Sequence, residues 1–266
     1  MSKTVLIISP FFTPNIGGVE THLDDLCFML SEQHIHTYVI TYQPLTTKAI
    51  GERLERRRTV TIFRQKWYGY NLFHKLEKYP LIEFLYLFPG IFLKSLFFTL
   101  KHKNEIGVVH SHGLVASFAA KVLKSIFKIK IIASTHAIYG FKKASLISKF
   151  VKYIFASFDK ILTLSTPSKE ELINIGVDAS RVEDYRYWID QEVFNPFSAD
   201  ERKKYREKLG WQNKFVVLFV GRLLEIKGVK LLLDAANLLK ENVYIAIIGD
   251  GPLAGEVKNS ANSNSK

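Results

Sequence analysis

The chain has 266 residues, which is long enough for one large domain or two modest ones, and its hydrophobic content of 47% excludes a disordered chain. Its one cysteine, Cys27, excludes a disulfide framework and a cysteine-rich metal site, and it favours a reducing compartment. The net charge of +12 is uneven, because residues 53–103 and 120–160 each carry +8 and the rest of the chain sums to −4.

Two kinds of anionic partner could meet these basic regions. Their lysines and arginines are mixed with bulky aliphatic side chains and phenylalanine, not with the glycine, asparagine and exposed aromatics of nucleic-acid motifs. We therefore expect an anionic membrane surface as a partner and no nucleic acid; the alternative is a basic soluble protein without a special partner. No secretory signal precedes the strand-like segment at Val5, so the expected location is the cytoplasm, peripherally on the inner face of the membrane.

Short apolar runs in the first 195 residues predict buried strands at 5–9, 37–41, 59–63, 108–110, 129–133, 160–164 and 182–187. Helical spacing of apolar residues predicts helices at 20–31, 117–127, 150–158 and 169–175. Ser168 is expected to cap the last of these helices and Gly176 to end it. Cys27 falls on the apolar face of the first helix and is expected in the core.

Residues 81–100 are strongly apolar and have nearly the length of a membrane span. Pro89 and Gly90 interrupt them, and Glu83 and Lys94 add charges. These features favour an interfacial or buried pair of helices over a spanning helix. The basic stretch that begins at Arg53 is expected to be a connection.

The pattern restarts after residue 196. A charged helix is expected at 201–209, strands at 215–220 and 243–248, and a helix between them at 229–239, whereas the tail 258–266 has no evident order. The strand at 215–220 is a continuous apolar run and is expected to be buried on both faces. Alternating strands and helices predict parallel sheets with helices on both faces. The fold class is therefore α/β, with domains at 1–195 and 196–266, the second with room for about two strands.

A cationic pair follows the first strand of the second domain. Arg222 and Lys227 lie on its exit loop, where open α/β sheets bind anionic ligands. Arg222 can fork onto two phosphate oxygens, and Lys227 can act as a mobile point charge. The turn Gly249-Asp250-Gly251 follows the next strand and would lie at the same edge, although ordinary turns share this composition.

Gly17 and Gly18 separate the first strand from the first helix. They would leave amide N–H groups open at a helix N-terminus, as a cradle for an anion or a sugar, and Glu20 follows them closely. A loop that merely needs positive φ is the alternative. Because the pattern is not Gly-x-Gly-x-x-Gly, a nicotinamide dinucleotide is unsupported.

Three histidines, His110, His112 and His136, lie at predicted carboxyl ends of strands. Lone histidines are usually structural, but three at one edge favour at least one in a ligand site. No matching carboxylate pattern accompanies them, so no metal is expected.

Together these residues make the chain resemble the retaining glycosyltransferases of family 4, which have the GT-B fold. The resemblance rests on residues 10–20, Val109-His110-Ser111-His112, Ser134-Thr135-His136, Leu164-Ser165 with Lys169, Trp188-Ile189-Asp190 with Phe194 and Pro196, Phe219-Val220-Gly221-Arg222 with Lys227-Gly228, and Ile248-Gly249-Asp250-Gly251-Pro252.

The resemblance implies a complete N-terminal Rossmann-like domain for the acceptor and a partial second one for a nucleotide-sugar, facing a cleft. It places Gly18 near the donor diphosphate and the transferred sugar, and His136 near the reacting sugar. It places Glu20, His110 and His112 on the acceptor side. Arg222 and Lys227 would neutralise the diphosphate as it leaves, so neither a metal nor another cofactor is needed. The acceptor would be a lipid-linked or cell-surface glycan.

The chain also departs from the family. Arg186-Tyr187-Trp188 stand where Pro-Asn-Gly is usual, and neither the Glu-x7-Glu motif nor the family's C-terminal helix is present. We expect a C-terminally truncated enzyme that is inactive as this fragment. A non-catalytic acceptor- or membrane-binding domain and a sugar-nucleotide epimerase remain as alternatives.

Overall fold

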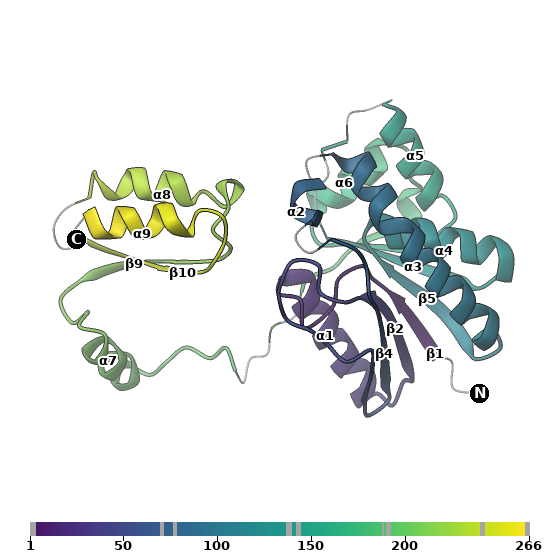
Figure 1. Cartoon of the computed structure of the whole chain (residues 1–266), viewed down its shortest axis with the longest axis horizontal. Helices are drawn as coiled ribbons and strands as arrows, with labels where there is room; N and C mark the ends of the chain where they lie inside the picture. The colour runs from purple at the N-terminus through teal and green to yellow at the C-terminus, as the bar shows by residue number, and fades with distance from the viewer. Residues whose placement is uncertain are drawn as a thin grey trace. The chain divides into compact units, whose positions relative to one another are not determined.

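The computed structural model describes residues 4–69, 72–76, 79–136, 140–141, 145–187, 189, 193–239 and 243–263 (Figure 1). The chain divides into two compact units, residues 1–188 and 189–266, which are described separately below. Trp188 and Asp190, which contribute to the family resemblance, lie outside the described residues.

The first unit is built on an eight-stranded sheet in the order β3-β4-β2-β1-β5-β6-β7-β8. Its strands are β1 (Thr4–Ile8), β2 (Thr37–Tyr42), β3 (Leu54–Arg57), β4 (Val60–Gln65), β5 (Ile106–His112), β6 (Lys130–Thr135), β7 (Lys160–Thr163) and β8 (Val182–Asp184). All neighbours pair in parallel except β3, which pairs antiparallel with β4. The predicted connection after Arg53 is therefore wrong. A strand at the sheet edge pairs on one side only and tolerates charged side chains such as those of Arg56 and Arg57.

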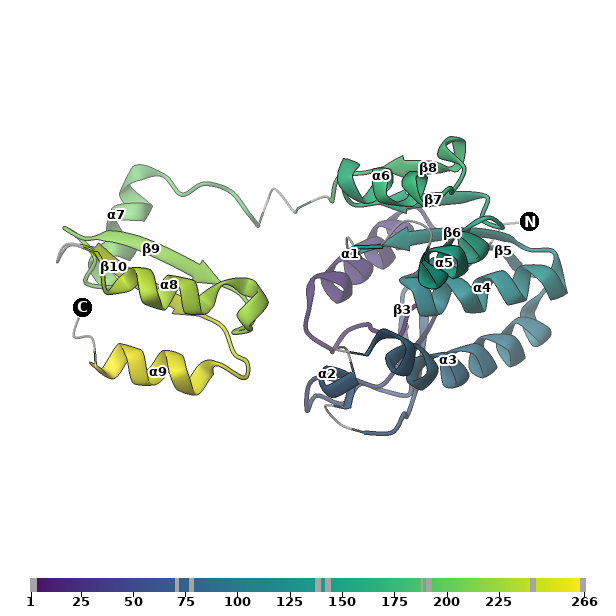
Figure 2. The ribbon, with the colours of Figure 1, turned by 90° about the horizontal axis from the view of Figure 1, so that it is seen from above.

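Helices cover both faces of this sheet (Figures 1 and 2). They are α1 (Gly18–Glu32), α2 (Leu72–Leu76), α3 (Pro80–His102), α4 (Leu114–Phe127), α5 (Leu146–Phe155) and α6 (Thr166–Asn174). One core packs α1 against the sheet through Ile7, Leu23 and Cys27, so the buried position predicted for Cys27 is confirmed. The larger core packs α3, α4 and α5 on the other face, through residues such as Leu87 and Ile154.

Helix α3 runs through Pro89 without a break, so the predicted helix pair is wrong. A side chain from β2 bonds the helix at this point. The hydroxyl of Tyr42 accepts the N–H of Ile91 and donates to the carbonyl of Leu87, both over 2.6 Å, and so bridges the turn of α3 that contains Pro89. A cap also differs from the prediction: Ser165, not Ser168, caps α6 by accepting the N–H of Ser168.

The second unit contains a parallel pair of strands, β9 (Phe215–Val220) and β10 (Val243–Ile248), which α8 (Val229–Ala236) connects. Helix α7 (Ala199–Lys208) precedes the pair, with a capping box of Ser198 and Glu201. Helix α9 (Ala254–Ser263) follows it, so the expected absence of order from residue 258 is wrong for the described part. Burial of β9 on both faces is also wrong within this unit, because Leu218 and Val220 are more than half exposed.

The topology of the first unit places a crevice between β1 and β5. From β1 the chain passes through α1 to β2 on one side, and it returns through α3 to β5 on the other side of β1. In open α/β sheets, loops that leave such a switch point part from each other and form the ligand site. The carboxyl ends of β1 and β5 are therefore the place to look for one.

Candidate functional site

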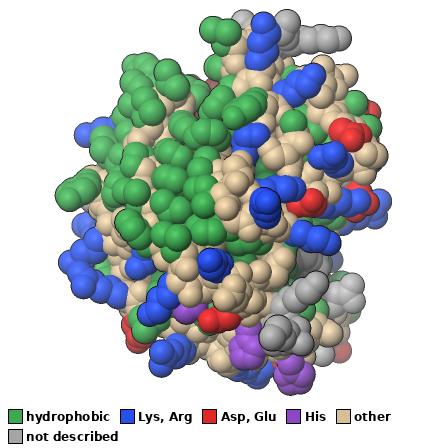
Figure 3. Space-filling view, turned by 90° about the vertical axis from the view of Figure 1, so that its right-hand side faces the viewer, with side chains coloured by type: hydrophobic (Ala, Val, Ile, Leu, Met, Phe, Trp, Pro, Cys, Tyr) green, Lys and Arg blue, Asp and Glu red, His purple; other side chains and the backbone are tan. Residues whose placement is uncertain are grey.

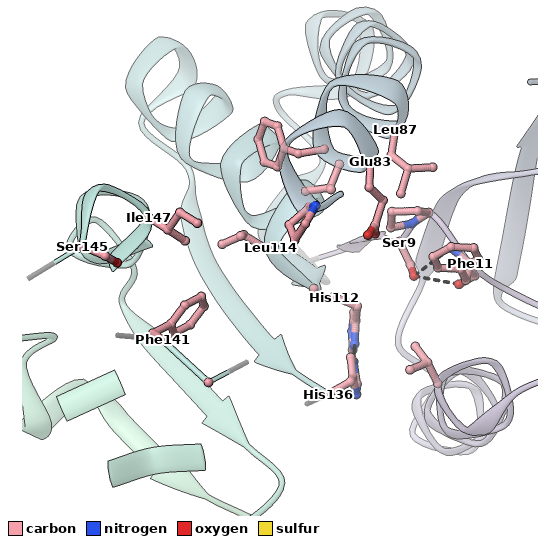
Figure 4. A pocket seen from close by; sticks show the side chains of 17 residues that line it. Ser9, Phe11, Glu83, Leu87, His112, Leu114, His136, Phe141, Ser145 and Ile147 are labelled. Atoms are coloured by element: carbon pink, nitrogen blue, oxygen red, sulfur yellow. Dashed lines mark hydrogen bonds between the residues drawn. The ribbon is translucent and has the colours of Figure 1, made fainter. Parts of the chain in front are cut away.

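A cavity of about 670 Å³ lies at this switch point (Figure 4). Ser9 and Phe11 line it from the loop after β1, and Glu83 lines it from the first turn of α3. Leu114 contributes from the start of α4, and Phe141 from the segment before α5. Its walls are mostly apolar, and Glu83 is the one carboxylate among the described residues that line it. An apolar cavity of this size with a few convergent polar groups is typical of a small-molecule site.

The structure brings the three predicted histidines together beside this cavity. His112 is the last residue of β5 and His136 follows β6, and both line the cavity. A hydrogen bond of 2.9 Å joins Nδ1 of His112 to Nε2 of His136. His110 lies behind them, where its Nε2 is 2.9 Å from Oγ of Ser134. The predicted gathering at one sheet edge is confirmed, while the roles of these residues stay predictions.

Three further aromatic side chains complete the cluster. The ring of His22, from α1, stacks on Tyr187 with centroids 4.1 Å apart, and its Nε2 lies 3.1 Å from the hydroxyl of Tyr185. The hydroxyl of Tyr187 also bonds Nδ1 of His136. These three residues were not predicted from the sequence. The alternation of Tyr185 and Tyr187 just after a strand was the available signal, because residues two apart in extended chain point the same way.

Burial keeps these imidazoles uncharged. It lowers the pKa of His22 and of His136 to about 4, and that of His110 to about 3 with a smaller effect from the neighbouring histidines. The pKa of His112 falls well below its usual value for the same reasons. A desolvated cation is costly, and each protonated ring would repel the next. At neutral pH the cluster therefore offers neutral donors and acceptors.

The hydrogen-bonded chain Tyr187, His136, His112 has one open end. With neutral rings, the hydrogen bonds can all be donated in the direction from Tyr187 to His112, or all in the opposite direction. In both arrangements Nε2 of His112 is the terminal atom, and it is buried without a hydrogen-bond partner among the described residues. Such an atom is costly to leave unpaired, so it fits a hydroxyl of a bound ligand. The described part of the chain contains no group of three or more His, Cys, Asp or Glu that could hold a metal ion.

The glycine turn at the start of α1 does not need glycine for a positive φ, which was the alternative to a ligand cradle. Neither Gly17 nor Gly18 adopts a left-handed φ. At Gly17 a Cβ atom would lie 2.4 Å from a carboxylate oxygen of Glu20, whereas at Gly18 it would meet only open space. Glu20 itself is buried and accepts a hydrogen bond of 2.5 Å from Asn15. Glu20 thus anchors the loop, and Gly18 presents open backbone.

In the second unit, Arg222 and Lys227 lie on the loop after β9, as predicted. Both side chains are exposed, and neither forms an ion pair in the described part of the chain. Gly228, the residue just before α8, adopts the left-handed conformation, with φ of 74°. Two exposed cations on one strand exit, ahead of a helix N-terminus, can approach an anion together.

The turn of Gly249, Asp250 and Gly251 packs directly on this loop. The N–H of Leu223 donates to the carbonyl of Asp250 over 2.9 Å. A Cβ atom at Gly249 would lie 1.9 Å from the carbonyl oxygen of Gly221, so only glycine allows the two loops to approach this closely. The predicted donor-side residues of this unit therefore share one strand edge.

Two family models match the chain. Glycosyltransferase Family 4 matches residues 16–184, and Glycosyl transferases group 1 matches residues 201–265. Among curated proteins, the GPI3 subunit of phosphatidylinositol N-acetylglucosaminyltransferase from Saccharomyces cerevisiae is 23% identical, over 95% of this chain and 54% of the relative. An uncharacterized glycosyltransferase of Methanocaldococcus jannaschii is 28% identical, over 94% of this chain and 64% of the relative.

Solved structures show the same fold. HepE of Anabaena, in complex with UDP, has a TM-score of 0.69 at 18% identity, with 99% of this chain and 66% of that chain covered. Sucrose-phosphate synthase from Thermosynechococcus elongatus has a TM-score of 0.68 at 15% identity, with 98% and 67% covered. The chain thus spans about half to two thirds of the length of the proteins that it matches.

Proposed function

The chain belongs to glycosyltransferase family 4, and we propose that it serves the retaining transfer of a sugar from a nucleotide-sugar to a lipid-linked or cell-surface glycan acceptor. The α/β fold of GT-B type predicted from the sequence is confirmed by the structural neighbours. The observation that carries the proposal is the exposed pair Arg222 and Lys227 on the exit loop of β9, in a chain of this family.

The donor side is proposed to lie in the second unit. A leaving nucleoside diphosphate gains negative charge, and fixed cations such as Arg222 and Lys227 would stabilise it without a metal or another cofactor. The turn at Gly249 lies against their loop and would narrow the site around the diphosphate. HepE, a structural neighbour, has been solved with UDP and with UDP-glucose, which supports a nucleotide-sugar as the donor class.

The acceptor side is proposed to be the cavity of the first unit. His136 and His112 would contact hydroxyl groups, because a neutral imidazole can donate or accept a hydrogen bond. Gly18 would let donor groups approach the backbone closely. Several curated relatives are subunits of phosphatidylinositol N-acetylglucosaminyltransferase, and this supports a lipid-borne acceptor over a soluble one.

Membrane association is part of the proposal. Helix α3 is, by length and composition, the one described helix apolar enough to cross a membrane, and buried helices of soluble proteins pass the same test. Since α3 packs on the sheet, we propose peripheral binding to an anionic membrane from the cytoplasmic side.

Nucleoside-diphosphate binding tests the proposal on the chain itself. UDP, GDP and ADP would be titrated calorimetrically into the wild type and into Arg222→Ala. Losing a charge-assisted hydrogen bond costs about 1.5–3 kcal/mol, so the best-bound nucleotide should weaken about 10- to 100-fold. Arg202→Ala is the matched control, because Arg202 is an exposed arginine of the same unit on α7. If no nucleotide binds the folded chain, or both variants bind equally well, the assignment fails and a non-catalytic domain becomes the better interpretation.

A further inference from the structure

One face of the first unit carries a continuous apolar surface. Large side chains of α3 that are at least 48% exposed recur at helical spacing, at Leu81, Leu85, Leu93, Phe97 and Leu100. The adjacent α4 and α5 add Ile126, Leu146, Ile147 and Tyr153. Figure 3 shows apolar side chains gathered on one face, with lysine and arginine side chains at its edges. A contiguous apolar surface of this kind marks an interaction site.

The charges around this face identify its partner. Residues 80–155 contain eleven lysines and two glutamates, and no other charged residue of the Asp, Glu, Lys or Arg types. Lys101, Lys128, Lys149 and Lys152 are exposed and form no ion pair in the described part of the chain. A protein partner would need a large acidic and apolar surface, whereas an anionic bilayer offers both features at once. Burial of apolar side chains and attraction to lipid phosphate then act together.

The cavity opens onto the same face. Pro80, Glu83 and Phe84 line it from the first turns of α3, which also carry the exposed Leu81 and Leu85. On the other side of the mouth, Ile147 lines the cavity and is 56% exposed. The cavity and the apolar surface therefore share the N-terminal turns of α3 and α5.

We infer that the cavity takes an amphiphilic lipid directly from an anionic membrane on which this face rests, and that this lipid is the acceptor. The lipid's hydroxylated head would lie at the polar end of the cavity, near Ser9, Glu83 and His112 (Figure 4). Its aliphatic part would lie between α3 and α5, against Phe84 and Ile147. The inference rests on the proposed function, and it adds the face through which the lipid would enter and the residues that its head and its aliphatic part would meet.

Photolabelling from vesicles tests it. Phosphatidylcholine vesicles with and without phosphatidylglycerol would carry a phospholipid with a diazirine in its acyl chain, and labelled peptides would be mapped by mass spectrometry. We expect labelling at Leu114 and Phe141 inside the cavity, and at Phe97 and Leu100 on the outer surface. Both should require phosphatidylglycerol and decrease at high salt. Labelling of the outer surface alone would overturn the cavity assignment, and labelling of neither would overturn the whole inference.

Two variants separate the cavity from the surface. Ile147→Glu places a charge in the apolar mouth and should reduce cavity labelling about tenfold, because burying a charge in an apolar site is costly, while labelling at Phe97 persists. Ile50→Glu is the control, since Ile50 is an exposed apolar residue of the same unit outside the cavity lining. Nucleoside-diphosphate titration of the same proteins distinguishes the two proposals. Intact nucleotide binding without cavity labelling defeats only this inference, whereas cavity labelling without nucleotide binding defeats the proposed donor site.

Discussion

Replacing Tyr42 with phenylalanine removes one hydroxyl from the centre of the larger core. That hydroxyl bridges the N–H of Ile91 and the carbonyl of Leu87, and all three residues are 1% exposed. Leaving one buried polar group unpaired costs about 1–3 kcal/mol, and two groups lose their partner here. The helix can recover part of this by closing the direct bond from Ile91 to Leu87, so we expect Tyr42→Phe to cost about 2 kcal/mol.

Scanning calorimetry measures this effect. For a unit of 188 residues, a loss of about 2 kcal/mol lowers Tm by about 4–8 °C. Tyr38→Phe is the matched control on the same strand, because the Tyr38 hydroxyl makes one exposed hydrogen bond of 3.4 Å, to Glu105. It should change stability by less than about 0.5 kcal/mol. Equal Tm values for the two variants would refute the reasoning that the hydroxyl of Tyr42 stabilises α3 around Pro89.

Three further predictions follow from the sites. In a version of the protein that transfers sugar, Arg222→Ala should raise the activation free energy by about 2–4 kcal/mol, measured as kcat/KM; unchanged kinetics in a folded variant would contradict it. Sedimentation with vesicles should require anionic lipid and weaken with salt; equal binding to neutral vesicles would count against an electrostatic contribution. Because the pKa of His22 falls from 6.5 to about 4 on folding, the unfolded chain takes up that proton first as the pH drops. Stability of the first unit should therefore decrease as the pH falls from about 6.5 to about 4, and a Tm that is constant over that range would exclude this linkage.

Much of the fold follows from local patterns. Apolar runs predicted β1 and β5, and the rule that ligands bind at the carboxyl ends of strands predicted a shared edge for His110, His112 and His136. The same rule put Arg222 on a strand exit. These inferences need only the spacing of apolar residues along the sequence and the direction in which the chain runs through each strand.

What the sequence could not predict depends on contacts between distant segments. The hydroxyl that bridges the turn around Pro89 belongs to Tyr42, which lies on another element. The stack of His22 on Tyr187 requires contact between α1 and the segment after β8, and local sequence patterns do not predict contacts between distant segments. The cap of α6 was predicted at Ser168 and is Ser165 in the structure, because any serine near a helix start can accept the capping hydrogen bond and packing selects one of them.

The two units divide the chemistry of recognition between them. Around the cavity, four histidines lie so close together that protonating one would raise the cost of protonating the next, and burial already disfavours the first proton. A site of neutral imidazoles and apolar walls suits hydroxyl groups and hydrocarbon, and it offers no positive charge to a phosphate. The exposed cations of the second unit, Arg222 and Lys227, offer that charge. If the cavity instead bound free inorganic phosphate more tightly at neutral pH than a hydroxylated amphiphile, this proposed division would be wrong. In the proposed transferase, a cavity lined by neutral imidazoles and a cationic strand exit would hold an uncharged acceptor group and a diphosphate leaving group as different ligands.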